Sequence, residues 1–305
     1  MKVLITGHTG FLGGSVAEYF HKQKHIVYGV SRSFRPNCAY SQYSMDIYEK
    51  ESLARLISEK HIDLIIHCAA KPIVADCAAD PFGAFKTNAL GTASVLEAAR
   101  VNNVKRIIVI ETDKVYGFQE TIPTTEDAIL NPQSPYELSK AMSSHLCDFY
   151  RRHYGMNIIS VRPVNLFGPG DISFTRLIPN AMRSIDAGLG IEIHSHAMNM
   201  YREFIYIIDA VKMIYILSTQ ATEFKVYNLS PGKMMSIYDT VMEIVKALDY
   251  SIEPIIVEKP GEYAEIPLQS IDGSRFVNEF GFTFTSFEQA IRETYLSYKN
   301  KEYIA

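Results

Sequence analysis

The sequence predicts an α/β fold built on a doubly wound parallel sheet, and two observations lead to this. The first is a series of short apolar runs rich in β-branched residues, at positions 3–5, 26–30, 63–67 and 106–110. Such near-continuous apolar strands are typical of a sheet that is buried on both faces. The second is that segments with helical apolar spacing, at 12–22, 49–60 and 84–102, separate these runs. Right-handed crossovers would then place helices on both faces.

The second half of the chain follows this alternation less strictly. A helix over 135–154 and a strand over 157–162 continue the pattern as far as Gly168-Pro169-Gly170. Beyond it, strand-like stretches at 191–194 and 225–229 mix with helical patterns at 238–248 and 286–298. We therefore expect one domain over residues 1–165 and a smaller mixed α/β lobe over 166–305, part of which re-enters the sheet.

Composition excludes several classes of protein. The 305 residues are 47% hydrophobic and 21% charged, as in globular proteins, and the net charge of −4 argues against general nucleic-acid binding. No apolar run approaches the ~20 residues of a membrane helix, and the first residues read as a strand rather than a leader. The four cysteines lie far apart without a CxxC pattern, and His194 and His196 have no third ligand beside them. We expect a cytoplasmic protein with no metal, nucleic-acid or membrane partner.

A glycine-rich turn follows the first predicted strand and opens the first predicted helix. Gly7 would permit the tight turn, Gly10 would let a pyrophosphate approach the backbone, and Gly13 would let the helix pack on the strand. The helix N-terminus would offer unpaired N–H groups to the phosphates. This predicts a dinucleotide site, and the residues expected to contact the cofactor here are Gly7, Thr9, Gly10, Phe11, Leu12 and Gly13.

The end of the second predicted strand bears on which dinucleotide is bound. NAD enzymes usually carry a carboxylate here for the ribose hydroxyls. In this chain Ser31 and Arg32 are followed by Ser33, Phe34 and Arg35, with no acid. Two arginines suit a 2′-phosphate, so NADP is favoured over NAD. The alternative is that Arg32 and Arg35 are solvated loop charges.

Tyr136 and Lys140 lie four residues apart on one face of the helix predicted over 135–154. A phenol with its ordinary pKa near ~10 is a poor base at neutral pH. A lysine ammonium group one turn away favours the phenolate, and so does a positive nicotinamide ring. Tyr136 could then accept a proton from a sugar hydroxyl as a hydride leaves for the cofactor.

With these motifs the sequence resembles the extended short-chain dehydrogenase/reductase family of nucleotide-sugar enzymes, whose cofactor domain is Rossmann-type. The resemblance covers essentially the whole chain. Segment 6–13 is similar to the family's TGxxGFxG, 111–117 to its S/T-x-x-VYG, 87–92 to its NxxGT and 136–140 to its YxxSK. Segments 162–170 and 202–209 are similar to its RPxNxYGPG and RDFIYVxD.

The resemblance implies further roles. Thr112 would bond the substrate oxygen beside Tyr136, and Asn165 and Arg202 would hold the diphosphate of a nucleotide-diphosphate sugar. Without that role, Asn165 would be a turn residue and Arg202 a surface partner of Glu203. In the family, the helices that correspond to those predicted from residues 84 and 135 often form a dimer contact, so the resemblance implies a homodimer. Residues implied along the cofactor are Asp46 and Ile47 at the adenine, Ala69, Ala70 and Lys71 along its path, and Asn88 supporting Lys140.

Asp113 and Lys114, directly after Thr112, bear on which reaction takes place. The resemblance implies an acid and a base here in sugar 4,6-dehydratases, and Asp-Lys is similar to the cytidine-linked glucose type. After C4 oxidation a base removes the C5 proton, an acid protonates the departing C6 hydroxyl, and the hydride returns to C6. Lys114 would be that base and Asp113 that acid, and the alternative is an ordinary charged pair in a loop.

Two departures keep other reactions open. Glu111 stands where the family usually has a small hydroxyl residue, and the chain is shorter than most dehydratases of this type. A nucleotide-sugar 4-epimerase or an NADPH-dependent 4-ketoreductase is therefore the alternative. A non-catalytic NADP-binding sensor is a further one, but such proteins typically lose the tyrosine or the lysine, and Thr112, Tyr136 and Lys140 are all present.

Overall fold

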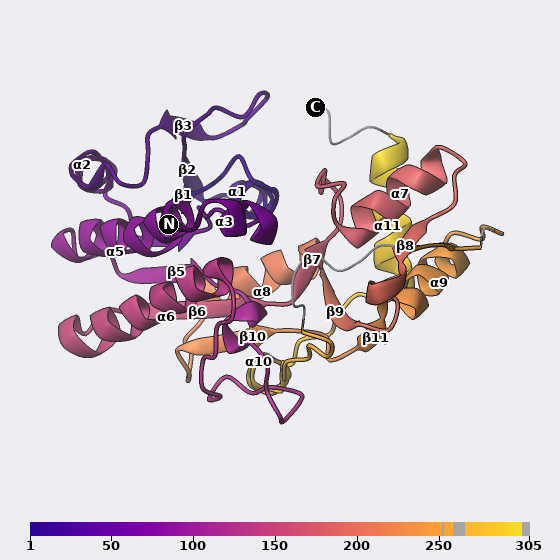
Figure 1. Ribbon diagram of the computed structural model, residues 1–305. Helices are drawn as coiled ribbons and strands as arrows, with labels where there is room; N and C mark the ends of the chain where they lie inside the picture. Colours follow the sequence, from indigo (N-terminus) through magenta and orange to yellow (C-terminus); the bar gives the residue numbers. More distant parts are fainter. Residues whose placement is uncertain (252, 259–265, 301–305) are drawn as a thin grey trace. The chain divides into compact units, whose positions relative to one another are not determined.

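The computed structural model describes residues 1–251, 253–258 and 266–300 (Figure 1). The chain divides into two compact units. The first comprises Met1–Gln119, Glu126–Pro163 and Val211–Asn228, and the second comprises Glu120–Thr125, Val164–Ala210 and Leu229–Ala305.

The central sheet has seven strands in the order β10-β6-β5-β4-β1-β2-β3. Its pairs run parallel, for example Val3 beside Val27 and Leu64 beside Arg106. The doubly wound parallel fold is thereby confirmed. The edge strand β3 was not predicted, because its sequence Ser-Gln-Tyr-Ser is polar and half-exposed. The strands are β1 (Lys2–Thr6), β2 (Ile26–Ser31), β3 (Ser41–Ser44), β4 (Leu64–His67), β5 (Arg106–Ile110), β6 (Ile158–Pro163) and β10 (Val226–Leu229).

Helices α2 (Lys50–Lys60), α5 (Gly91–Val101) and α6 (Pro135–Tyr154) pack in sequence on the sheet, α5 against both of the others. The core that they share with the strands includes Leu53, Leu96 and Cys147 beneath Leu4 and Ile65. Because strand side chains alternate, Val3 and Ile5, both fully buried, lie on the other face. Helix α1 (Phe11–Lys22) packs on β1 and β2, and its Phe20 ring contacts Tyr215 on α8 (Ile207–Thr219).

The helix predicted over 84–102 is helical as far as Val101, but its first part is a π-helical segment that the sequence did not predict. After the short helices α3 (Val74–Ala79) and α4 (Pro81–Ala84), residues Phe85–Leu90 form a π-helical turn, and α5 begins only at Gly91. A π turn widens the i→i−4 ladder by one residue without changing which residues are apolar. The apolar spacing therefore gave no sign of it.

The second unit holds two small sheets, one with the order β11-β9-β7 and the other pairing β12 with β8. Its helices α9 and α11 each begin after a serine, Ser236 and Ser286, whose hydroxyl accepts a first-turn N–H as an N-cap. The strands are β7 (Asn165–Phe167), β8 (Glu192–His194), β9 (Tyr201–Tyr206), β11 (Met234–Ser236) and β12 (Ile255–Val257). The helices are α7 (Leu177–Asp186), α9 (Ile237–Ala247), α10 (Ser274–Phe280) and α11 (Phe287–Lys299).

Across these described ranges, none of the helices combines the length and the apolar character that spanning a membrane requires.

Candidate active site

The glycine-rich turn connects β1 to α1. Gly7 has φ +72°, and a Cβ atom there would lie 2.7 Å from the backbone nitrogen of Ala69. A Cβ on Gly13 would lie 2.3 Å from the carbonyl oxygen of Gly7. A Cβ on Gly10 would meet only that same oxygen, at 3.3 Å, so space remains beside this glycine. The two outer glycines let the chain fold tightly, and the middle one leaves room for a ligand.

The N-terminus of α1 begins immediately beyond this space. Gly10 is its N-cap residue, and no side chain caps the first N–H groups, those of Phe11 and Leu12 among them. The Thr9 N–H points instead to the Ser31 hydroxyl at the end of β2, 3.4 Å away. Unpaired N–H groups and the positive end of the helix dipole beside an open backbone suit a diphosphate. These residues therefore fit the cofactor that the sequence predicted.

The segment after β2 holds two arginines in different settings. Arg32 is exposed, and its carbonyl accepts from Ser44. The Arg35 guanidinium lies 2.7 Å from the Glu18 carboxylate on α1. Asp46 and Ile47 follow β3, where Asp46 Oδ1 accepts from the Tyr48 N–H and Ile47 is buried. Arg32 is thus the arginine of this segment that lies open to solvent, while Arg35 has an acidic partner.

Asn88 lies in the π turn and holds the segment that follows β4. Its Oδ1 accepts the Lys71 N–H at 2.8 Å, and its Nδ2 donates to the Lys71 carbonyl and the Ser139 hydroxyl. Ala69 and Ala70 precede Lys71, and the Ala69 N–H donates to the Thr6 hydroxyl. The Lys71 ammonium group pairs with Asp80 at 2.8 Å. Asn88 therefore fastens residues 69–71 to α6.

Helix α6 begins abruptly just before Tyr136. Ser134 and Glu137 form a capping box, in which each side chain accepts the other residue's N–H, and Pro135 takes the first helical position. Tyr136 follows in the first turn, where it is buried with Cys77 and Ala84. Lys140 lies one turn later, is buried, and donates to the Ile110 carbonyl at 2.8 Å. The two residues thus share one helix face, as their spacing predicted.

The setting of Lys140 is largely apolar and uncharged. Burial lowers the pKa of Lys140, and the Glu111 carboxylate opposes that change. Burial also lowers the pKa of His67, at the end of β4, to about 3, with a further contribution from Lys140. Burial of the Cys68 thiol raises its pKa to about 12. His67 and Cys68 are therefore uncharged near neutral pH.

Thr112, Asp113 and Lys114 form the turn that leaves β5. Thr112 caps the 3₁₀ helix Asp113–Tyr116: its hydroxyl accepts the Lys114 N–H and donates to Asp113 Oδ1 at 3.1 Å. Asp113 Oδ2 is buried and has no hydrogen-bond partner among the described residues. The Lys114 side chain is half-buried. Gly117 closes the turn with φ +57°, and a Cβ there would lie 1.8 Å from the Asn131 carbonyl oxygen.

A buried charge pair next to this turn was not predicted. Glu111 Oε2 accepts from Arg162 Nε at 2.8 Å and from the Ser144 hydroxyl at 2.5 Å. Arg162 Nη1 also donates to the Tyr116 hydroxyl at 2.9 Å. Glu111 and Arg162 both lie in motifs that are recognisable in the sequence. An acid at position 111 is unusual for the family, and this was the sequence feature that could have suggested a buried basic partner.

The two residues expected to bind the substrate diphosphate lie in the second unit. Asn165 on β7 donates to the Glu203 carbonyl on β9 at 3.1 Å, so its amide joins two strands. Arg202 on β9 donates to the carbonyls of Tyr201 and Ile266 and is half-buried. The Glu203 carboxylate is buried and accepts from the hydroxyls of Ser230 and Ser270. Arg202 is therefore held by backbone carbonyls of its own unit.

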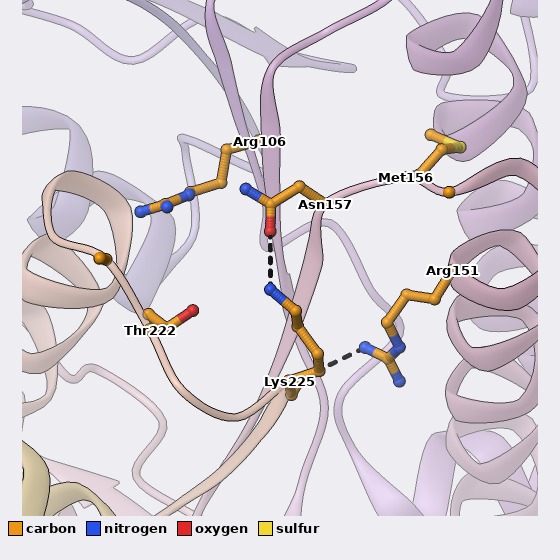
Figure 2. Close-up of a pocket in the computed structure, with 8 residues that line it drawn as sticks. Arg106, Arg151, Met156, Asn157, Thr222 and Lys225 are labelled. Atoms are coloured by element: carbon orange, nitrogen blue, oxygen red, sulfur yellow. Dashed lines mark hydrogen bonds between the residues drawn. The ribbon is translucent and has the colours of Figure 1, made fainter.

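A pocket of about 450 Å³ lies elsewhere, at the amino ends of β5, β6 and β10 (Figure 2). Arg106 donates to the carbonyls of Leu217 and Gln220 at the end of α8. Lys225 donates to Asn157 at 3.2 Å, and Arg151 to the Lys225 carbonyl at 3.3 Å. These contacts join strand and helix ends, so we assign the cations a structural role. In the described parts of the chain, three or more His, Cys, Asp or Glu side chains nowhere gather to hold a metal ion.

Comparisons with known proteins are consistent across sequence and structure. The family model described as the NAD dependent epimerase/dehydratase family matches residues 3–230. A dTDP-glucose 4,6-dehydratase from Shigella flexneri is 27% identical over 335 residues, covering 96% of this chain and 91% of that protein. A GDP-6-deoxy-D-talose 4-dehydrogenase from Aggregatibacter actinomycetemcomitans is 27% identical over 97% of each chain. The fold is similar to that of a Thermotoga maritima UDP-glucose 4-epimerase, with a TM-score of 0.91, 23% identity, and 99% of this chain and 100% of that one covered.

Proposed function

The chain belongs to the NAD dependent epimerase/dehydratase family, and from this premise we propose that it is a nucleotide-sugar 4,6-dehydratase. Membership confirms the predicted kinship with the short-chain dehydrogenases/reductases that act on nucleotide sugars. The observation that carries the choice of dehydration is the buried carboxyl of Asp113, whose Oδ2 lacks a partner among the described residues beside Thr112 and Lys114. An epimerase has no use for an acid and a base beyond its tyrosine, whereas elimination requires both.

Oxidation at C4 would be the work of Tyr136. Its phenolate would remove the proton from the C4 hydroxyl while the Thr112 hydroxyl holds the same oxygen. Lys140, one turn along α6 and fixed to the Ile110 carbonyl, would stabilise the phenolate through its charge. NAD(P)⁺, bound at the glycine-rich turn, would supply the acceptor for the C4 hydride and return that hydride to C6.

Elimination would be the work of Lys114 and Asp113. A ketone at C4 acidifies the C5 proton, which Lys114 would remove. Asp113 would protonate the C6 hydroxyl, so that the C6–O bond breaks and water leaves. A proton returned to C5 and a hydride at C6 complete a 4-keto-6-deoxy sugar with no net redox change.

The residues expected to hold the cofactor are those of the glycine-rich turn, Ser31 and Arg32 after β2, Asp46 and Ile47 after β3, and the segment 69–71 with Asn88. Within this set the preference for NADP rests on exposed Arg32 and on the lack of an acid between Ser31 and Arg35. An Arg32→Ala variant should lose about tenfold in affinity for NADP and change little for NAD, as measured by the quenching of protein fluorescence. Equal losses for both dinucleotides would contradict the NADP assignment.

The substrate side of the proposal involves the second unit. Asn165 and Arg202 would hold the diphosphate of a nucleotide-diphosphate sugar. The half-buried Arg202 offers a guanidinium that is already fixed by carbonyls, which suits bidentate binding of a phosphate. Assembly as a homodimer through α5 and α6 remains part of the proposal, supported by exposed Leu138, Met142 and Phe149 along α6.

Reduction at C4 is the second candidate function. One observation favours it: the chain matches the sugar 4-dehydrogenase over 97% of both lengths, more evenly than it matches the dehydratase. Asp113 and Lys114 would then only shape the turn.

Mass spectrometry distinguishes these functions. The protein is incubated with NAD⁺ or NADP⁺ and a panel of nucleotide sugars, and separately with NADPH and a nucleotide-linked 4-keto sugar. Loss of one water from a sugar supports dehydration. Unchanged mass with altered stereochemistry would indicate epimerisation, and a gain of two hydrogens from NADPH on a 4-keto sugar would indicate reduction. Either of the latter as the only activity would overturn the proposal.

A further inference from the structure

The proposed reaction gives no role to the buried carboxylate of Glu111. Glu111 follows β5 directly, and its side chain is fully buried. Oε2 accepts from Arg162 and Ser144, whereas Oε1 is buried without a hydrogen-bond partner among the described residues. A buried carboxylate is costly unless it is paired, so its burial here needs a physical reason.

The backbone places Glu111 beside the lysine of the proposed site. Lys140 donates to the carbonyl of Ile110, the residue just before Glu111. Ser144, which donates to Glu111, lies one turn beyond Lys140 on α6. Tyr136, Lys140 and Ser144 therefore follow one another along one helix face, and the Glu111 carboxylate adjoins that face just past the ammonium group.

The other titratable groups around Lys140 do not supply a negative charge. Burial raises the pKa of Cys77, and it raises that of Cys147 to about 12. With His67 and Cys68, these groups are uncharged near neutral pH. Glu111 is the carboxylate whose charge acts on Lys140 most strongly. The titratable groups that interact electrostatically with the Lys140 ammonium group are His67 at the end of β4, Cys68 after it, Cys77 on α3, Cys147 on α6 and Glu111 after β5.

We propose that Glu111 is a positioning residue: its buried carboxylate places a negative charge next to the Lys140 ammonium group, which the Ile110 carbonyl holds at the end of β5. Arg162 and Ser144 fix the carboxylate from its other side, so that the charges alternate from Lys140 through Glu111 to Arg162. The inference rests on the proposed function for the role of Lys140 itself. Its consequence is that Tyr136 keeps a cationic neighbour at alkaline pH, which extends the pH range of C4 oxidation.

The test is the pH profile of C4 oxidation in Glu111→Gln, which keeps shape and removes charge. Reduction of the bound dinucleotide by a nucleotide hexose is followed by its absorbance from pH 5 to pH 10. Loss of the Lys140 proton sets the alkaline limb, and this limb should move down by about one pH unit or more. Glu97→Gln is the matched control: it makes the same substitution at a carboxylate that pairs with Arg100 and accepts from Tyr150, ten residues beyond Lys140 on α6, so its alkaline limb should stay in place. An unmoved limb in Glu111→Gln would overturn the inference.

A second measurement does not depend on turnover. Lysine labelled with ¹³C at Cε is titrated by NMR, and the Lys140 signal is assigned by its loss in Lys140→Arg. The pH midpoint of its titration should fall by about one pH unit or more in Glu111→Gln, and an unchanged midpoint would contradict the role of Glu111. A shifted midpoint in a protein that oxidises no nucleotide sugar would support the role of Glu111 and refute the proposed function.

Removal of one member of a buried ion pair can prevent folding. If Glu111→Gln is recovered unfolded, the double variant Glu111→Gln/Arg162→Met removes both charges together and takes its place in both measurements. Because loss of the Arg162 cation itself favours the charged form of Lys140, the double variant is compared with Arg162→Met, and its alkaline limb and NMR midpoint should lie below those of that single variant. Equal values in the two folded variants would overturn the inference.

Discussion

The two ends of the central sheet in the first unit both carry cations, in contrasting surroundings. At the carboxyl ends of β5 and β6, Arg162 and Lys140 are buried and adjoin a buried carboxylate. At the amino ends, Arg106 and Lys225 line an open pocket and bond to carbonyl and amide oxygens (Figure 2).

The difference lies in what each cation does for the chain. Arg106 binds the last carbonyls of α8 and so satisfies groups that any helix C-terminus leaves unpaired. Lys140 and Arg162 serve no helix end, and burying them costs free energy that a purely structural residue would avoid. The cations at the amino ends of the strands are bound by carbonyl oxygens. The buried charges at the carboxyl ends therefore indicate that the carboxyl ends are where the chemistry takes place.

The largest expected effect comes from Tyr136→Phe, which removes the proposed base. Turnover of the nucleotide sugar should fall by about 10²–10⁴-fold, because the phenolate can no longer accept the C4 proton. Lys225→Ala at the amino ends is the matched change and should leave turnover unaltered. Steady-state kinetics measures both, and circular dichroism checks that both variants are folded. A Tyr136→Phe enzyme within threefold of wild type would contradict the assignment.

The next effect concerns stability. Arg162→Met leaves Glu111 buried without its cation and should lower the free energy of unfolding by about 3–5 kcal/mol. Lys105→Met, just before β5 at the amino ends, breaks a pair between an exposed ammonium group and Asp63 and should cost about 1 kcal/mol or less. Urea unfolding at neutral pH compares the two. Equal losses would mean that burial does not distinguish the two ends.

A smaller effect is the contribution of His67 to the pH dependence of the free energy of unfolding. Its pKa is about 3 in the folded protein and near its ordinary 6.5 when unfolded, so between these values the unfolded chain binds more protons. Stability should therefore fall as pH drops from 6.5 toward 3. His67→Gln should flatten that slope by up to about 1.4 kcal/mol per pH unit. His25→Gln, at the less buried amino end, should change it less, and unfolding at pH 7.5 and 5.5 checks this.

The fold followed from the sequence where burial was complete. The strands at positions 3–5, 63–67 and 106–110 are apolar on both faces, and such short β-branched runs fit few structures besides a buried parallel strand. The strand Ser41–Ser44 and the π turn Phe85–Leu90 were missed because an exposed edge strand needs no apolar run and a widened turn keeps the same periodicity. Local patterns therefore identified the elements and missed their irregularities.

For the site, the sequence was sufficient where partners lie within one element. Tyr136 and Lys140 are one turn apart on a helix, and the glycines of the first turn are three apart, so spacing alone brings each set together. The bonds of Glu111 to Ser144 and Arg162 join residues 33 and 51 positions apart. No local pattern encodes such pairs: the parallel register of β5 and β6 brings Arg162 beside Glu111, and the packing of α6 on the sheet brings Ser144 there.

The position of deuterium in the product tests the central claim, elimination across C5 and C6, most directly. With a nucleotide hexose that the protein oxidises at C4, in D₂O, the product should lack one water and carry one deuterium at C5, because the proton returned there comes from solvent. Lys114→Met should still reduce the bound dinucleotide and form no dehydrated sugar. A dehydrated product without deuterium at C5, or full dehydration by Lys114→Met, would contradict the proposed mechanism.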